Sequence, residues 1–434
     1  MAILFRRVLL LLLGAYICFT CYSGYLLFTR EDRNLRSIPN QSASSYLDKA
    51  NLRSTVDRSD DDWNPWGEDF EPERVNAARG DPAHTSYSRQ VEDNRPAKYT
   101  VEIWGKAAIG NYLWEHIFAA RLETREDGAL RSGSKKIGNI RFKYRTGPGI
   151  IPQTAPSDVE YLILVLNGRS KDKISFARSW LDYLDNYPRL QHTIVILLGD
   201  EQCRNGWLTR YMRSKGGKID AAFIVYDTGL VDDHEIFQWP LGVATYRGFG
   251  PLDSHKLDIE SSRPYKCNFL GTVYPKSSRK VLMDIISRQN GLNKACFTKP
   301  REEWLPNETS QSLQMYQYAL SLSDLTLNPV GMNTECYRIY EAMAYGSVPV
   351  VEDKTTPGLC QNPALRLLKK HKAPFIYVKN WITDFPRILG QEAALSLKEK
   401  IERRVALVEW YEGFKLDMRK LLIDIAKRKF GLTD

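Results

Sequence analysis

Short apolar runs that alternate with helical patterns are the feature that most limits the fold of this chain. The segments 159–169 (VEYLILVLNGR) and 192–203 (HTIVILLGDEQC) are almost wholly apolar over strand-sized lengths, as buried parallel strands are. Between them, residues 175–187 have the spacing of an amphipathic helix. A further apolar run, 221–227, continues the series. Strand, helix and strand in this order predict an α/β fold with a doubly wound sheet.

The pattern stops and then begins again. A polar, turn-rich stretch runs from Pro240 to about Pro264. Beyond it the same criteria predict strands at 267–274, 324–331, 347–351 and near 374, and helices at 278–288, 312–323 and 334–345. A chain of 434 residues exceeds one comfortable core. We therefore predict two Rossmann-like domains, 98–250 and 251–390, that face each other across a cleft.

The C-terminal region predicts one long helix that closes the structure. Apolar residues recur there at helical spacing, at Leu397, Ile401, Val405 and Val408. We assign residues 391–434 to this closing helix.

The N-terminal region predicts a membrane anchor. The segment from Val8 to Phe28 contains no charged residue and is long enough to span a bilayer as a helix. Arg6 and Arg7 precede it, so the positive-inside rule leaves residues 1–7 cytosolic and the rest of the chain lumenal. We expect a single-pass type II anchor at 8–28, with a cleaved signal peptide as the alternative.

A stem is expected between the anchor and the first domain. Residues 29–97 are polar, acidic in part and poor in apolar periodicity. Lumenal placement predicts glycosylation at the sequons of Asn40 and Asn307. Beyond the anchor the chain has five cysteines, so at least one is unpaired in an oxidising compartment.

The predicted helix 334–345 has two unlike faces. Thr334 is an acceptable N-cap, and Gly346 lies where a left-handed C-terminal residue is favoured. At 100° per residue one face is apolar, while the other carries Thr334, Arg338, Glu341 and Tyr345. An ordinary surface ion pair between Arg338 and Glu341 is the simpler interpretation.

The position of this helix favours a binding role for its polar face. It follows a predicted strand through the loop NPVG, and ligands of doubly wound sheets bind at the carboxyl ends of strands. Gly331 permits close backbone approach, free amides near Asn333 and Thr334 attract phosphate, and Arg338 can bind phosphate oxygens in a fork. Glu341, one turn along, is placed to accept ribose hydroxyls. The residues predict a nucleotide diphosphate donor site.

Other reaction classes lack their signatures. No Walker A, GxGxxG, HExxH or GxSxG motif is present, and no cysteine spacing matches a zinc site. The triplet 60–62 (DDD) falls in the predicted stem instead of after a strand. We therefore expect no metal ion and no cofactor other than the donor substrate. The net charge is +9, and the basic residues are scattered along the chain. This distribution argues against nucleic-acid binding.

Residues 326–353 resemble the donor-site signature of the exostosin-like glycosyltransferases of the two-Rossmann, or GT-B, type. The segments LLGDEQC, WPLGV and RPYKCNFLGT are similar to secondary signatures of that family. The anchor, WNPW, VEIWGKAAIGNYLWEHIF and EIFQWPLGVATYR resemble members that act on the O-mannosyl glycan of α-dystroglycan. This resemblance implies transfer of xylose from UDP-xylose to ribitol 5-phosphate on that glycan. It also implies a Golgi membrane location and a complex with fukutin-type ribitol-phosphate transferases.

One departure bears on the mechanism. Many retaining transferases of this fold carry a second glutamate eight residues before the ribose-binding one, and Asn333 stands at that position here. We therefore expect an inverting reaction, in which a base removes the proton of the attacking hydroxyl.

The base is expected from the N-terminal domain. The polar residues that follow its predicted strands are Asp200, Glu201, Asp227, Glu115 and His116, of which we favour Asp200 or Glu201. Each has a structural alternative, because a carboxylate after a strand often caps a turn and a helical histidine is often packed. Lys106, in the first strand-end loop, is the predicted ligand of the acceptor's phosphate.

Two other functions fit the same residues. One is an exostosin-like transferase that uses another UDP-sugar, such as UDP-GlcNAc or UDP-glucuronate. The other is a lumenal glycan-binding protein without turnover, in which Arg338 and Glu341 could be replaced without loss of function.

Overall fold

The computed structural model describes residues 96–433, except 127, 254–256, 289–291 and 304–308. The predicted anchor, the stem up to residue 95, Asn40 and Asn307 lie outside the described residues. Within the described part, no helix combines the length and apolar character that a membrane crossing requires. All described residues belong to one compact unit.

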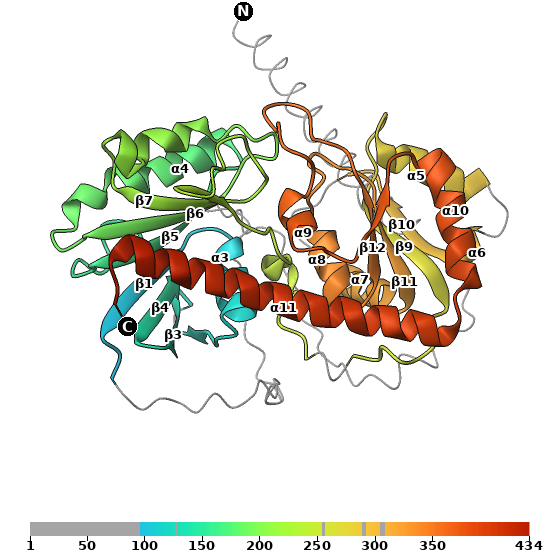
Figure 1. The fold of residues 1–434 in the computed structure, drawn as a ribbon, viewed down its shortest axis with the longest axis horizontal. Coiled ribbons are helices and arrows are strands. Elements are labelled where there is room, and N and C mark those ends of the chain that lie inside the picture. Colours follow the sequence, from blue (N-terminus) through green and yellow to red (C-terminus); the bar gives the residue numbers. More distant parts are fainter. Residues whose placement is uncertain (1–95, 127, 254–256, 289–291, 304–308, 434) are drawn as a thin grey trace, which may run out of the picture. The chain divides into compact units, whose positions relative to one another are not determined.

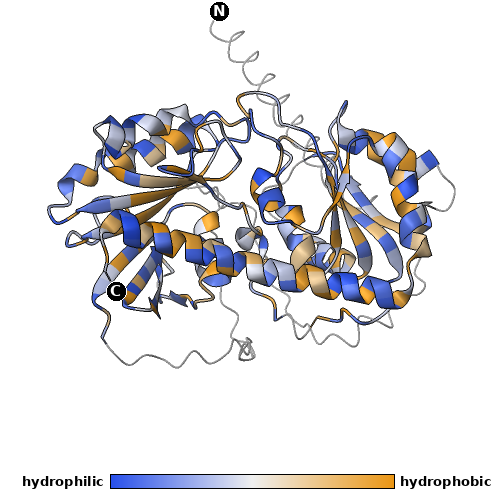
Figure 2. Cartoon of the chain, viewed as in Figure 1, coloured by the Kyte–Doolittle hydropathy of each residue, from blue (hydrophilic) through white to orange (hydrophobic). Residues whose placement is uncertain are grey.

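The first half is built on an eight-stranded sheet with the order β2-β3-β4-β1-β5-β6-β7-β8 (Figure 1). From β4 to β8 every neighbouring pair is parallel. The strands of this parallel part are β1 (Tyr99–Gly105), β4 (Ile140–Thr146), β5 (Tyr161–Asn167), β6 (His192–Leu198), β7 (Ile219–Ile224) and β8 (Ile236–Gln238). Strands β5, β6 and β7 are almost wholly buried and hydrophobic (Figure 2), which confirms the buried strands expected there, whereas β4 and β8 were not predicted.

The helices of this half are short. The expected helix within 175–187 is α4 (Lys171–Asp182), followed by the 3-10 turn η2 (Leu184–Asn186). The helical segment after β1 is irregular, since α3 (Ile109–Asn111) passes into the π-helical η1 (Tyr112–Ile117). Further 3-10 turns are η3 (Gly206–Tyr211), η4 (Arg213–Lys215) and η5 (Thr245–Arg247).

An antiparallel edge was not predicted. Strands β2 (Glu123–Thr124) and β3 (Arg131–Ile137) extend the sheet beyond β4. Every residue of β3 is half-buried or exposed, so its sequence lacks the apolar alternation used to find strands. Gly138, with φ +59°, and Asn139 form the turn between β3 and β4. This Gly-Asn pair is a hairpin signal that could have revealed the edge.

The second half is a five-stranded parallel sheet with the order β10-β9-β11-β12-β13. Its strands are β9 (Tyr265–Thr272), β10 (Cys296–Arg301), β11 (Ser323–Asn328), β12 (Val348–Glu352) and β13 (Ile376–Val378). Its helices are α5 (Ser278–Arg288), α6 (Leu292–Ala295), α7 (Ser310–Ser321), α8 (Tyr337–Ala344), α9 (Arg366–Lys370) and α10 (Trp381–Ala394). Apart from β10, the strands were predicted. The mixed α/β fold with two Rossmann-like sheets is thus confirmed.

Helix α8 begins later than predicted. Its N-cap is Cys336 and its first residue Tyr337, so Thr334 is not the cap. The Thr334 hydroxyl instead donates to the carbonyl of Lys354, and its amide donates to Thr356 Oγ1. These bonds tie the loop after β11 to the loop after β12. Gly346 has φ +66°, as expected for a left-handed C-terminal residue.

The closing helix starts at residue 397, not 391. Residues 391–394 belong to α10, and α11 (Leu397–Phe430) begins with a capping box formed by Ser396 and Glu399. Helix α11 contacts elements of both halves, including η1 and β6 in the first and α8 in the second (Figure 1).

Two disulfides account for four of the five cysteines that follow residue 28. Cys203–Cys360 joins the loop after β6 to the loop after β12, and Cys267–Cys296 joins β9 to β10. Cys336 is free, as the odd number predicted. The first disulfide links the two halves.

Arg404 on α11 offers a test of how the closing helix stabilises the fold. Its side chain is fully buried, and it donates to the carboxylate of Asp324 and to the carbonyls of Ile259 and Ser261. Arg404→Leu leaves Asp324 buried without this partner, so we expect unfolding free energy to fall by about 3–5 kcal/mol in urea titrations. The matched change at exposed Lys420 on the same helix, Lys420→Leu, should stay within about 0.5 kcal/mol. Equal stability of the two variants would contradict this role of Arg404.

Candidate active site

The carboxyl ends of β9, β11 and β12 lie at one edge of the second sheet, because these strands are parallel neighbours. Ligands of doubly wound sheets bind at this edge. The residues that reach it come from the end of β9, the start of α5, the loop 329–336 and helix α8.

Arg338 lies against the end of β9. Its Nη2 donates to the carbonyl of Leu270 at 2.8 Å, and its guanidinium stands 4.8 Å from the ring centroid of Phe269. Its Nε and Nη1 are buried and make no hydrogen bond to the described residues. A Cβ on Gly271 would lie 2.4 Å from Arg338 Nη2, so the glycine is needed for this approach. The surface ion pair between Arg338 and Glu341, the simpler alternative to a binding role, is not formed.

Arg279, from the first turn of α5, is the second cation at this edge. Its Nη1 donates to the carbonyl of Thr272 at 2.8 Å, and its buried Nε makes no hydrogen bond to the described residues. A Cβ on Gly331 would lie 2.2 Å from Arg279 Nη2. Burial, together with the positive charge of Arg338, lowers the pKa of Arg279 to about 10. Two guanidinium groups held so close favour an anion between them, as a diphosphate would be.

Glu341 points into the interior instead of lying on an exposed face. Its Oε1 accepts from the amide of Ala244 at 3.2 Å and its Oε2 from the hydroxyl of Tyr316 at 2.7 Å. Burial raises the pKa of Glu341, and these two hydrogen bonds oppose the shift. Tyr345, predicted on the polar face, is buried as well. A carboxylate has about four acceptor positions, so the predicted contact with ribose hydroxyls stays a prediction.

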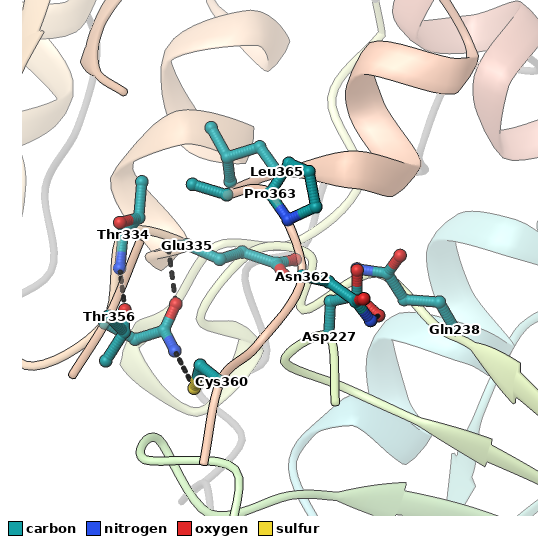
Figure 3. Close-up of a pocket in the computed structure, with 11 residues that line it drawn as sticks. Asp227, Gln238, Thr334, Glu335, Thr356, Cys360, Asn362, Pro363 and Leu365 are labelled. Carbon is teal, nitrogen blue, oxygen red and sulfur yellow. Dashed lines mark hydrogen bonds between the residues drawn. The ribbon is translucent and has the colours of Figure 1, made fainter. Parts of the chain in front are cut away.

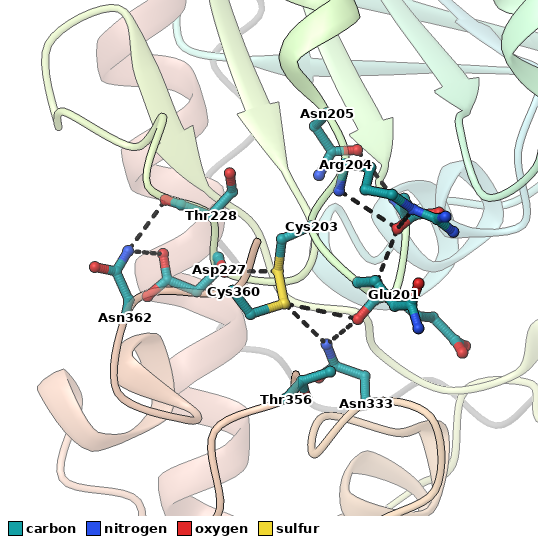
Figure 4. The surroundings of a disulfide bond; sticks show 12 residues. Glu201, Cys203, Arg204, Asn205, Asp227, Thr228, Asn333, Thr356, Cys360 and Asn362 are labelled. Atoms are coloured by element: carbon teal, nitrogen blue, oxygen red, sulfur yellow. Dashed lines mark hydrogen bonds and ion pairs between the residues drawn. A yellow bond between two sulfur atoms is a disulfide. The ribbon is translucent and has the colours of Figure 1, made fainter. Parts of the chain in front are cut away.

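Asn333 connects the donor edge to the first half of the protein. Its Nδ2 donates to the backbone carbonyl of Glu201 at 2.7 Å, and its Oδ1 accepts from the amide of Glu335. Figure 4 shows Asn333 beside the Cys203–Cys360 disulfide, where both halves meet. Asn333 and Thr334 therefore shape the loop after β11 through their side chains.

Glu201 faces the donor edge from the carboxyl end of β6. Its carboxylate pairs with Arg169, which follows β5, and accepts from the hydroxyl of Tyr226 at 3.4 Å. Its negative charge acts on the pKa of Arg279 across the junction. Tyr226 is buried and has φ +64°, which is rare for a bulky residue and often accompanies a functional role.

Asp200 and Asp227 are engaged in structural bonds. Burial alone would raise the pKa of Asp200, but hydrogen bonds from Arg204 and two backbone amides lower it overall. Asp200 thus caps a turn and is a weak base. Both oxygens of Asp227 bind Arg366 in the second half, at 2.7 and 3.0 Å. Among these three carboxylates at strand ends, the side chain of Glu201 is the most accessible, whereas those of Asp200 and Asp227 are buried.

Glu115 and His116 lie on η1, in the interior of the first half. The ring of His116 is buried with Nε2 3.2 Å from the carbonyl of Phe249. Burial lowers the pKa of His116 to about 3, and the positive charge of Lys415 adds to the effect, so the ring is neutral. Glu115 is half-buried and lies 3.8 Å from Arg131. This geometry favours packing over proton transfer for both residues.

Lys106 does not present its charge to the surface. It is buried, and its Nζ donates to the carbonyls of Gly147 and Ile150 at 3.1 and 2.9 Å. The geometry gives no support to the predicted contact between Lys106 and an acceptor phosphate.

A polar pocket lies where the two halves meet (Figure 3). Glu335 lines it and is itself buried; its Oε1 accepts from the amide of Leu241 and the hydroxyl of Tyr340. Burial raises the pKa of Glu335 to about 7, against the opposing effect of these hydrogen bonds. The described residues contain no group of three or more His, Cys, Asp or Glu side chains placed to hold a metal ion.

Sequence reasoning missed Arg279, Glu335 and Tyr226. Arg279 lies in the first turn of the helix that follows a predicted strand. Ligand-binding residues of such sheets often lie there, so the sequence did offer a signal for Arg279. Glu335 adjoins the predicted donor residues but gives no local signal of its burial. The positive φ of Tyr226 is a property of the folded backbone, and the sequence carries no signal for it.

The raised pKa of Glu335 predicts a specific dependence of stability on pH. The folded state keeps this proton up to about pH 7, whereas the unfolded carboxyl loses it near 4.5, so this contribution to stability falls as pH rises between them. Glu335→Gln has no such proton to lose, so its unfolding free energy relative to the wild type should rise by about 3 kcal/mol between pH 4.5 and pH 8. Thermal unfolding from pH 4.5 to 8 measures this.

The control is Glu302→Gln, a change at an exposed carboxylate. Its stability curve should run parallel to that of the wild type. A Glu335→Gln curve that also runs parallel would contradict the raised pKa.

Comparison with known proteins identifies the family. Family models described as RXYLT1 N-terminal domain and RXYLT1 C-terminal domain match residues 101–240 and 246–431. The chain is 43% identical to ribitol-5-phosphate xylosyltransferase 1 of Danio rerio, over 98% of each chain. It is 41% identical to the Homo sapiens protein of that name, over 99% of this chain and 98% of the relative. The chain therefore belongs to the ribitol-5-phosphate xylosyltransferase family of glycosyltransferases.

Proposed function

We propose that this chain transfers xylose from UDP-xylose to ribitol 5-phosphate. The names of its relatives, which match over nearly the whole chain, support the xylosyl transfer and the acceptor. The observation that carries the donor assignment is the pair Arg279 and Arg338 beside Gly271 and Gly331. A nucleoside diphosphate sugar needs positive charge at its diphosphate, and more of it as the UDP departs.

The proposal includes the GT-B arrangement. Two sheets support it, the first parallel from β4 to β8 and the second parallel throughout, together with the contacts through which Asn333 and the Cys203–Cys360 disulfide join their carboxyl ends. It also includes the type II Golgi anchor at 8–28 and the O-mannosyl glycan of α-dystroglycan as the acceptor's carrier. A complex with fukutin-type transferases belongs to the same proposal.

The reaction is inverting in this proposal. A ribitol hydroxyl attacks the anomeric carbon of xylose from the side opposite the UDP, as the bond from that carbon to the β-phosphate oxygen breaks. The bonding electron pair leaves on UDP, where Arg279 and Arg338 bind the added charge. Glu201, held by Arg169 and Tyr226, accepts the hydroxyl proton. The two arginines provide the charge that a divalent cation supplies elsewhere, so the transfer is independent of metal.

The first test is a transfer assay with purified full-length protein. UDP-xylose and an acceptor that carries ribitol 5-phosphate, in EDTA, should give a xylosylated product. UDP-GlcNAc and UDP-glucuronate serve as competing donors. Preferred transfer from either would overturn the donor assignment, and no transfer from any of them by folded protein would favour a glycan-binding role.

Glu201→Gln tests the base in the same assay. We expect kcat to fall about 100-fold or more with little change in the KM for UDP-xylose, because the amide cannot take the proton. Glu302→Gln, at an exposed site, is the matched control. Wild-type kcat in Glu201→Gln would exclude Glu201 as the base.

A further inference from the structure

The polar pocket between the halves differs in chemistry from the arginine site. It is lined by the carboxamides of Gln238, Asn333 and Asn362, the hydroxyls of Thr334 and Thr356 and the carboxylates of Asp227 and Glu335. No lysine or arginine is among the described residues that line it. Such a lining can donate to and accept from hydroxyl groups but offers little to a phosphate.

Most of these polar groups already have partners. Asn362 Nδ2 donates to Asp227 Oδ1 and to the carbonyl of Thr228, and Asn333 Nδ2 donates to Glu201. The Thr334 hydroxyl donates to Lys354. These bonds hold the walls of the pocket in place; Figure 4 shows those made by Asn333 and Asn362, and Figure 3 shows the residues that line the pocket.

Gln238 and Glu335 are the exceptions. The side chain of Gln238 is 94% buried, given its 6% exposure, yet its amide makes no hydrogen bond to any residue that the structure describes. Glu335 uses Oε1 for both of its hydrogen bonds, and Oε2 has none within the described part of the chain. A bound ligand with hydroxyl groups would supply the hydrogen-bond partners that these two side chains lack.

The rest of the lining also suits the chemistry of a polyol. Pro363, Ala364 and Leu365 form an apolar side that can pack against carbon atoms. The Cys203–Cys360 disulfide and the Asp227–Arg366 ion pair fix the two walls relative to each other, so little ordering is needed on binding. Asn333 joins the pocket to Glu201, the proposed base, through one hydrogen bond. This proximity favours the acceptor over the donor sugar.

We propose that this pocket is the subsite for the polyol chain of the acceptor, with Gln238 and Glu335 binding its hydroxyl groups. The inference rests on the proposed function for the identity of the acceptor. The pocket binds the hydroxyl-bearing carbon chain, and the acceptor's phosphate lies outside it.

Gln238→Met tests the inference, because methionine keeps the shape of glutamine and removes its hydrogen bonds. We expect the KM for the ribitol-phosphate acceptor to rise about ten-fold or more, with the KM for UDP-xylose unchanged. Gln361→Met, at an exposed residue of the same loop region outside the pocket, should leave both constants unchanged. Unchanged acceptor KM in Gln238→Met would overturn the proposal. If Gln238→Met does not fold, Gln238→Asn replaces it.

Direct binding separates this inference from the reaction itself. Ribitol 5-phosphate and inorganic phosphate are titrated into full-length protein by calorimetry. Saturable binding of the first alone, weakened in Gln238→Met and not in Gln361→Met, supports the subsite even if xylose transfer fails. Equal binding of the two probes, or no binding of ribitol 5-phosphate by the wild type, would mean that the pocket holds only water, and would overturn the proposal.

Discussion

Two positive charges held side by side at the edge of a sheet are the constraint on which the site depends. Arg279 and Arg338 approach the backbone only because Gly271 and Gly331 lack side chains, and their buried nitrogens are only partly hydrogen-bonded within the described residues. Like charges in a poorly solvated place repel, as the lowered pKa of Arg279 reflects. A bound diphosphate would relieve this repulsion, which links the local geometry to a nucleotide-sugar donor.

The junction between the two halves determines what can stand opposite that donor. Residues on the loops after β6 and β12 are joined by the Cys203–Cys360 disulfide, and Asp227 pairs with Arg366 beside it. Helix α11 contacts both halves as well. Glu201 is therefore held near the arginines by covalent and ionic links, and a reaction between two bound substrates benefits from such fixed positions.

The sequence was sufficient for the parallel sheets and for Arg338, because buried strands and a strand-end helix have strong local patterns. It was insufficient for charged side chains whose role depends on whether they are buried. Lys106 looked like a surface cation, yet inward-facing carbonyls bind it, and Glu341 looked exposed until Ala244 and Tyr316 were found against it. Arg279 lacked any pattern that joined it to Arg338. Cysteine pairing likewise depends on which loops meet in space.

The most direct test of the donor site is calorimetric titration of UDP into full-length protein in EDTA, with the variants Arg279→Gln, Arg338→Gln and the two combined. We predict saturable binding to the wild type, about ten-fold or more weaker binding to each single variant, and none detectable to the double variant. Lys420→Gln, at an exposed cation, should bind as the wild type does. Wild-type affinity in the folded double variant would contradict the assignment of the diphosphate to these arginines.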